Sequence, residues 1–583
     1  MKEHLYRWRN KQLREHTAVI DGEVSPTMVL TNATYLNVFL KRWMTANIWI
    51  YDDRIVYVGQ DLPNMSGQAE IIDCKNQYLV PGYIEPHAHP FQLYNPHSLA
   101  EYSSKKGTTT FINDNLMLLL LLNKKKAFSL LDDMQRLPVS MFWWARFDLQ
   151  SEIRDEDDLL TDDDVMEWLN HEAVIQGGEL TNWPDILDDD DRALYWIQEA
   201  KRLRKIVEGH FPGASERTLI KMKLLGTDGD HESISGEELY NRVKLGYYAG
   251  MRYSSIRPDL PNILKDLHDY DGEFWDYLFY TTDGSTPSFY EQGVIDRCIK
   301  IAIEQGVPLE DAYAMATINA ARYFSLDHRL GSISPGRTAH INFLKAKDDP
   351  TPTAVLGRGE WIETGSEGYS FKNRDRNIKW EKYGFGSLNL SWDLKQEDLL
   401  FSSPIGIGMV NDVIMKPYPV KLDSQSDQLS KDHNESYLVL VDREGKWKIS
   451  SFLKGFTSSL GGLVSSYSNT GDIVLIGKNK EDIRKAFDRM KELGGGIVLV
   501  NDGEIIFELP LPLNGVMTNL PMHKLIDKEK QLKDILMSHG YQFNDPIYTL
   551  LFLSSTHLPY IRITPQGIID IKKKEILFPS VMR

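Results

Sequence analysis

The 583-residue chain is 42% hydrophobic and 26% charged, a composition that excludes a disordered or fibrous protein. Its 66 basic residues are outnumbered by 83 acidic ones, giving a formal net charge of −17 at pH 7. Because binding to nucleic acid or to anionic membranes depends on surplus positive charge, we expect neither as a partner.

The N-terminal segment lacks the apolar run that a secretory signal needs. The apolar block at residues 116–122 is much shorter than the roughly 20 residues of a membrane-spanning helix. The two cysteines, Cys74 and Cys298, are too few for a disulfide framework or a cysteine zinc site, which favours a reducing compartment. We therefore predict a cytoplasmic protein.

The first 330 residues contain two regions with different sequence patterns. Residues 1–80 begin with a predicted helix over 1–20 and continue as short alternating strands around the turn signal Asp52-Asp53. From residue 81 to about 330, short apolar runs alternate with helical stretches, the pattern of repeated βα units. That length, about 250 residues, predicts a (β/α)8 TIM barrel.

The remaining sequence returns to strands and then forms another domain. A strand-like stretch at 339–344 can pair with the N-terminal strands, so residues 331–375 are predicted to complete one small composite β-sandwich domain with residues 1–80. Residues 376–583 contain further strands and a helix near 482–493, which indicates a separate α+β domain of ordinary size. The predicted fold class is therefore α/β, a barrel flanked by these two domains.

The first candidate chemical motif is His87-Ala88-His89, at the end of an apolar run in the predicted barrel. Side chains two residues apart on a strand point the same way, so both imidazoles can reach one metal ion. Barrel enzymes build their active sites at the carboxyl ends of the strands. The alternative is a pair of ordinary polar residues at a strand end.

Later strand-like segments strengthen the metal interpretation, since each ends in a residue of ligand type. If the barrel closes, these side chains converge with the first two histidines and can hold two divalent cations bridged by a carboxylate. The other histidines, His557 among them, have no ligand-like neighbours in the sequence, and we assign them no function. The four added candidates are Glu179, His210, His231 and Asp283.

This order of ligands resembles that of the amidohydrolase superfamily of metal-dependent barrel hydrolases. Within it, the chain resembles the adenine deaminase family along nearly its whole length. The C-terminal domain is included in the resemblance. The similar segments are residues 81–89, 107–110, 207–213, 230–233, 314–321, 331–336 and 509–515.

The resemblance implies hydrolytic deamination, in which adenine and water give hypoxanthine and ammonia. It implies two divalent ions, manganese in preference to iron or zinc, held by His87, His89, Glu179, His210, His231 and Asp283. Glu179 would bridge the ions, and Asp283 would act as general base and then as general acid. Glu232 is a second candidate for proton handling, its alternative being an acidic residue at a helix start. The partners implied are a small purine-like substrate and, in a homodimer, a second copy of the chain.

Several outer motifs depart from the family pattern. Arg252 and Ser255 are retained and are predicted to bind substrate, whereas Gln92 lies in a segment that lacks the usual acid and hydroxyls. Gly284 replaces a second aspartate, and residues 466–472 lack the family's histidines. Because unpaired buried polar groups are costly, such changes can shift the substrate. Two alternatives follow: an amidohydrolase for another amino-heterocycle or cyclic amide, and a catalytically silent binding module, against which the complete ligand set argues.

Overall fold

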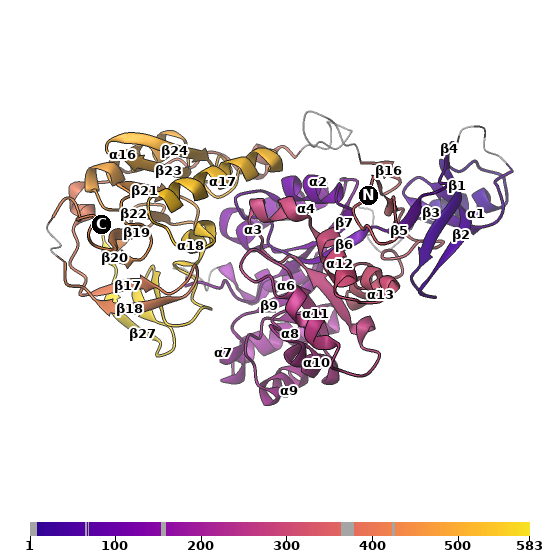
Figure 1. The fold of residues 1–583 in the computed structure, drawn as a ribbon, viewed down its shortest axis with the longest axis horizontal. Helices are drawn as coiled ribbons and strands as arrows, with labels where there is room; N and C mark the ends of the chain where they lie inside the picture. Colours follow the sequence, from indigo (N-terminus) through magenta and orange to yellow (C-terminus); the bar gives the residue numbers. More distant parts are fainter. Residues whose placement is uncertain (1–7, 65–66, 68, 153–158, 363–377, 423–425) are drawn as a thin grey trace.

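A computed structural model describes most of the chain as three parts (Figure 1). The small β-domain and the C-terminal domain lie at opposite ends of the long axis, with the barrel between them. No helix within the described ranges combines the length and the apolar character needed to cross a bilayer. Residues 1–7 of the predicted N-terminal helix and the predicted domain boundary at 375–376 lie outside the residues that the structure describes. The described residues are 8–64, 67, 69–152, 159–362, 378–422 and 426–583.

The small β-domain is one eight-stranded sheet built from both flanks of the barrel. Its central strand, just before the barrel, pairs in parallel with the first strand and antiparallel with the strand that follows the barrel. Apolar residues from both flanks share one core, including Leu30 and Ile341. Its elements are α1 (Asn10–Ile20), β1 (Met28–Asn37), β2 (Arg42–Tyr51), β3 (Arg54–Gly59), β4 (Glu70–Asp73), β5 (Tyr78–Pro81), β14 (Ile341–Leu344), β15 (Ala354–Gly357) and β16 (Glu360–Trp361).

Eight parallel strands follow one another in chain order around the barrel. A backbone bridge between Ala88 and Asp283 joins the first strand to the segment after the last. Most strand residues are buried, as expected for strands covered on both faces. The strands are β6 (Tyr83–Ala88), β7 (Thr108–Asn113), β8 (Ser140–Ala145), β9 (Val174–Leu180), β10 (Ile206–Gly209), β11 (Gly229–Asp230), β12 (Tyr248–Arg252) and β13 (Leu278–Thr281).

Several barrel helices are amphipathic and begin with a polar side-chain cap, as the helix before β10 illustrates. Asp190 accepts hydrogen bonds from two backbone amides at its start, and Trp196 and Ile197 lie on its buried face. The helices are α2 (Pro96–Ser104), α3 (Leu116–Leu121), α4 (Lys124–Met134), α6 (Asp162–Asn170), α7 (Trp183–Leu187), α8 (Asp191–Arg202), α9 (Glu216–Leu224), α10 (Gly236–Lys244), α11 (Leu260–Leu267), η1 (Trp275–Tyr277), η2 (Pro287–Gln292), α12 (Ile295–Glu304), α13 (Leu309–Met315) and α14 (Ile318–Tyr323).

The C-terminal domain contains a nine-stranded sheet, a three-stranded sheet and several helices. The predicted fold class is thereby confirmed. The larger sheet has β17 (Ile405–Met409), β18 (Met415–Pro419), β19 (Glu435–Val441), β20 (Trp447–Lys454), β21 (Gly462–Ser465), β22 (Ile473–Gly477), β23 (Gly496–Asn501), β24 (Glu504–Pro510) and β28 (Val581–Met582). The smaller sheet has β25 (Ile561–Thr564), β26 (Gly567–Asp570) and β27 (Glu575–Pro579). The helices are α15 (Trp380–Tyr383), η4 (Gln396–Leu399), α16 (Lys480–Glu492), α17 (Met522–Ser538) and α18 (Pro546–Phe552).

The C-terminal domain contacts the loops at the carboxyl ends of the barrel strands. In the loop after β8, Ser151 forms a backbone bridge with Ser555 and accepts a hydrogen bond from Asn469 Nδ2 at 2.6 Å. In the loop after β6, Leu93 forms a backbone bridge with Met517. Because barrels build their sites at this end, the C-terminal domain is placed to complete a site that the barrel begins.

Candidate metal centre

His87 and His89 lie at the end of β6 and are both buried. The ring of His87 stacks on Trp144, with 4.5 Å between ring centroids. His89 Nδ1 lies 2.7 Å from Asp114 Oδ2, while Arg146 donates to both oxygens of that carboxylate. The carboxylate therefore orients the His89 ring and turns its Nε2 toward the barrel centre, an arrangement common around metal-binding histidines.

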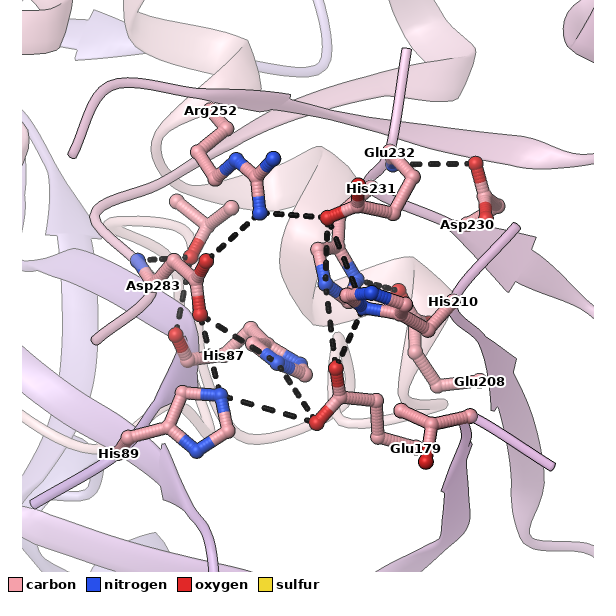
Figure 2. A network of polar contacts seen from close by, with 12 residues as sticks. His87, His89, Glu179, Glu208, His210, Asp230, His231, Glu232, Arg252 and Asp283 are labelled. Atoms are coloured by element: carbon pink, nitrogen blue, oxygen red, sulfur yellow. Dashed lines mark hydrogen bonds and ion pairs between the residues drawn. The ribbon is translucent and has the colours of Figure 1, made fainter. Parts of the chain in front are cut away.

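Glu179, at the end of β9, lies between two pairs of histidines (Figure 2). Its Oε2 is 3.7 Å from His87 Nε2 and 3.7 Å from His89 Nε2. Its Oε1 is 2.7 Å from His210 Nδ1 and 3.6 Å from His231 Nε2. One carboxylate thus faces imidazole nitrogens with each of its oxygens, which is the geometry that a bridging ligand requires.

Asp283 follows β13 and closes the ring of candidate ligands. Its Oδ1 lies 3.0 Å from His89 Nε2 and 3.9 Å from His87 Nε2, and its Oδ2 accepts from Arg252 Nη1 at 2.9 Å. Burial alone would raise the pKa of Asp283, but the hydrogen bond from His89 and the charge of Arg252 outweigh it and hold that pKa well below its usual range. Its backbone φ of +51° lies in the left-handed region, which few residues other than glycine adopt and in which aspartate and asparagine are the commoner exceptions.

The donor atoms of these side chains fit divalent metal ions. Within the described ranges they form three sets in which all donor atoms lie within 4.8 Å of one another, and Glu179 belongs to two of the sets. Among the residues that the structure describes, His87 Nε2 and His231 Nε2 are buried and have no hydrogen-bond partner, although buried polar atoms are normally satisfied. Neutral imidazoles and carboxylates suit first-row divalent cations. The sets are His87, His89 and Glu179; His87, His231 and Asp283; and Glu179, His210 and His231.

A second carboxylate orients His231, which follows β11. Its Nδ1 lies 3.2 Å from Glu208 Oε1, so its Nε2 faces Glu179. Tyr323 in turn donates a hydrogen bond to the other oxygen of Glu208. The two carboxylates, Glu208 here and Asp114 beside His89, therefore define ring orientations on opposite sides of the cluster.

Glu232 is held by two arginines at the edge of the cluster. Its Oε1 lies 2.5 Å from Arg252 Nη1, and its Oε2 lies 2.6 Å from Arg257 Nη1. Burial alone would raise the pKa of Glu232, but the Arg252 charge and that of His210 outweigh it and lower the pKa to about 2. Glu232 does not begin a helix, because α10 starts four residues later with Ser235 as its cap. It is a charged carboxylate that also lies 3.5 Å from His210 Nδ1.

The two predicted substrate-binding residues have different surroundings. Arg252 lies between Glu232 and Asp283 and belongs to the cluster (Figure 2). Ser255 does not, because its hydroxyl accepts from the Thr286 backbone amide at 3.3 Å and hydrogen-bonds with Asp545 of the C-terminal domain. The structure therefore brings Arg252 to the metal centre and places Ser255 at the junction between the two domains.

One histidine near this site, His557, was not predicted from the sequence. His557, in the C-terminal domain, has its ring perpendicular to that of His210 with 5.8 Å between centroids. Its Nδ1 lies 3.3 Å from the backbone oxygen of Gln150, whose side chain donates to Glu179 Oε2 at 3.1 Å. His557 has no metal-ligand spacing in the sequence, and only the docking of the two domains reveals it. Asp114, by contrast, follows a strand and could have been found by the same strand-end reasoning as the ligands.

Two family models and several close relatives match the chain. The amidohydrolase family model matches residues 78–365, and the adenine deaminase C-terminal domain model matches residues 412–575. A "Putative adenine deaminase" from Oceanobacillus iheyensis is 53% identical over 99% of both chains. One from Bacillus subtilis is 52% identical over the full length of both. The chain belongs to the adenine deaminase family of amidohydrolases. The predicted membership of this metal-dependent family is thus confirmed.

Solved structures with lower similarity also align with this amidohydrolase. A β-aspartyl dipeptidase from Fervidobacterium islandicum is 15% identical and covers 59% of this chain and 98% of its own, with a TM-score of 0.46. An N-acetylglucosamine-6-phosphate deacetylase from Pasteurella multocida is 14% identical and covers 58% and 100%, with a TM-score of 0.44. Both scores are below 0.5, so the family assignment depends on the sequence relatives and family models.

Proposed function

We propose that this amidohydrolase is a metal-dependent deaminase that converts adenine and water to hypoxanthine and ammonia. The observation that carries the proposal is the position of Glu179, which faces both histidine pairs across from Asp283. The substrate follows from the name of the full-length relatives, with which the chain shares about half of its residues. The proposed partner is accordingly a small heterocyclic molecule.

We propose that two divalent cations are held here, with Glu179 shared between them. His87, His89 and Asp283 would hold one ion, because Asp283 Oδ1 lies near both of these histidines, and His210 and His231 would hold the other. Manganese is the proposed metal, and iron or zinc would suit the same donor atoms. Bound cations of this kind make a water molecule more acidic and therefore easier to deprotonate.

The side chains then have distinct tasks in the reaction. Asp283 is ionised, and we assign its Oδ2 the role of accepting the proton of the attacking water and donating it to the departing amino group. Arg252, 2.9 Å from that oxygen, holds the carboxylate in place. As the water oxygen bonds to the purine carbon, the carbon–nitrogen bond breaks, and ammonia leaves with the transferred proton.

An ammonia-release assay tests this function. Metal-loaded protein is expected to release ammonia from adenine, and chromatography should show hypoxanthine as the other product. Other aminopurines and pterins serve as comparison substrates. Release from one of these and none from adenine would refute adenine as the substrate and favour the second candidate, deamination of another amino-heterocycle. That candidate is favoured by two departures from the pattern that the resemblance implies, Gln92 and Gly284, which lie close to each other and to His89.

Metal binding is expected to release protons at neutral pH. Burial alone would lower the pKa of His89, but hydrogen bonds with Asp114 and Asp283 outweigh it and raise the pKa to about 10. Burial alone would also lower the pKa of His231, but the hydrogen bond with Glu208 helps to outweigh burial, and the pKa is raised to about 9. Both rings therefore hold an extra proton at pH 7 in the metal-free protein, and each must lose it to bind metal. The affinity for Mn²⁺ should rise with pH up to these pKa values.

Calorimetric titration with Mn²⁺ in buffers of different ionisation enthalpy measures this release, and at least two protons per protein are expected, because the pKa of His210 is raised as well. A His433→Gln variant, in which a histidine outside the site is changed, serves as the control and should release the same number. Heats that do not depend on the buffer would contradict the expectation.

We propose a homodimer that acts in purine metabolism, as the resemblance implied, and a cytoplasmic location, as the sequence composition predicted. Light scattering of the purified full-length protein measures the number of subunits, and a mass of one chain would refute the dimer. The chain's own mass is 67.0 kDa.

A further inference from the structure

Gln92 is hydrogen-bonded to the C-terminal domain close to the candidate metal ligand His89. It follows His89 in the loop after β6 and is 2% exposed, and Tyr467, after β21, is fully buried. The Tyr467 hydroxyl donates a hydrogen bond of 2.5 Å to Gln92 Oε1. Because the oxygen of the carboxamide is engaged in this way, its Nε2 is directed to the other side, and its two N–H donors are presented there.

Gly284 shows where that nitrogen lies. A Cβ on Gly284 would be 3.1 Å from Gln92 Nε2, 2.9 Å from the Tyr548 hydroxyl oxygen and 3.2 Å from His89 Cβ. Any side chain here would displace these groups. The absence of a side chain therefore lets two polar groups, one from the barrel and one from α18, approach the backbone next to Asp283.

Both polar groups keep hydrogen-bonding capacity. Within the described part of the chain, no protein group accepts a hydrogen bond from Gln92 Nε2, and none is bonded to the Tyr548 hydroxyl. Tyr548 is 3% exposed, and burial, together with the nearby Asp283 charge, raises the pKa of its hydroxyl well above the usual value. Two polar groups with unused hydrogen-bonding capacity, both within reach of the backbone next to Asp283, are placed to bind a ligand.

We propose that Gln92 and Tyr548 form the edge of the active site that recognises the substrate ring, with Tyr467 as a positioning residue for Gln92. The proposal rests on the proposed function and deepens it. Gln92 Nε2 donates to an acceptor atom of the heterocycle, a ring nitrogen or a ring carbonyl oxygen, while Tyr467 prevents the carboxamide from turning its oxygen toward the substrate. The enzyme is thus selective for amino-heterocycles with an acceptor at this edge.

A cycle of variants and substrate analogues tests the proposal. The enzyme is assayed with adenine and with deaza-adenines that each lack one ring nitrogen, before and after Gln92→Leu. A site that hydrogen-bonds a substrate atom rejects an analogue without it, so wild-type kcat/KM should fall at least about 10-fold for one analogue. Gln92→Leu should cause a similar loss with adenine and little further loss with that analogue.

Tyr467→Phe provides the second arm. Removing the hydroxyl frees the carboxamide to rotate, so we expect it to weaken the discrimination between adenine and the same analogue, with the change in KM rather than in kcat. Tyr83→Phe is the matched control, because its buried hydroxyl donates to the Pro350 carbonyl at 2.7 Å from the first residue of β6, at the other end of the strand. It should leave the discrimination unchanged, and metal content and thermal unfolding confirm that each variant is folded.

The outcomes separate this proposal from the proposed function. Deamination of adenine by the wild type, with Gln92→Leu lowering kcat/KM by one common factor for every substrate or not at all, overturns the recognition edge alone. If another amino-heterocycle is the substrate, the same cycle is run with that compound and its analogues. If metal-loaded wild type deaminates none of them, the proposed function is refuted and this proposal with it.

Discussion

Asp283→Asn is expected to lower kcat/KM for deamination by about 10³-fold or more while the protein stays folded. Asparagine has nearly the same shape as aspartate, but its amide cannot accept the proton that we assign to Asp283 Oδ2. The partners of that oxygen and its neighbour, Arg252 and His89, would also face a neutral group. Steady-state kinetics with the metal-loaded variant measures the loss.

The control for this variant is Asp276→Asn, in η1 just before β13, where the carboxylate is half-exposed and pairs with Lys41. It removes the same charge from the opposite end of the strand that leads to Asp283, and it should retain wild-type kinetics. An Asp283→Asn enzyme with a tenth or more of wild-type activity and normal metal content would refute the role assigned to Asp283.

Glu179→Gln is expected to reduce the bound metal from about two equivalents to one or fewer. Each oxygen of Glu179 faces a different pair of histidines, so replacing one oxygen with an amide group that donates removes a ligand from one ion and places N–H groups against the other site. The change keeps the size of the buried side chain. Elemental analysis after reconstitution and dialysis gives the metal content.

Glu208→Gln provides a graded comparison, because Glu208 contacts His231 without facing the shared carboxylate directly. Loss of such an outer partner typically weakens metal binding about 10–100-fold, so one ion should be retained more weakly and the other as in the wild type. Two equivalents bound by Glu179→Gln with unchanged affinity would show that this carboxylate bridges no metal.

The part of the site that could be predicted is the part that depends on strand ends. His87, His89, Glu179, His210 and Asp283 each come at or just after the end of an apolar strand, and parallel strands bring their carboxyl ends to one edge. The closed barrel therefore places them together once the number of strands is known. For the same reason the pairing of the two flanking β-segments could be predicted, since both adjoin the same end of the barrel.

The rest depends on contacts that no local pattern encodes. Glu232 was predicted to handle protons. Whether it can do so depends on the groups around its carboxylate, and its contacts with Arg252 and Arg257 are visible only in the structure. Ser255 occupies a family motif, yet its hydroxyl is directed to the interdomain junction. His557 reaches the site from the C-terminal domain, more than 300 residues away from its neighbour His210.

Gln150 links the two domains to the proposed bridging ligand. Its side-chain amide donates to Glu179, its backbone oxygen accepts from the amide of Thr556, and its φ of +59° is a conformation that the surrounding contacts must hold. A barrel separated from its C-terminal partner would lose that support at Glu179, the carboxylate that we propose the two ions share. The two domains look separable in the sequence, but this contact makes them depend on each other. We expect exchange of one domain for that of a relative to succeed only when the contact at Gln150 is exchanged with it.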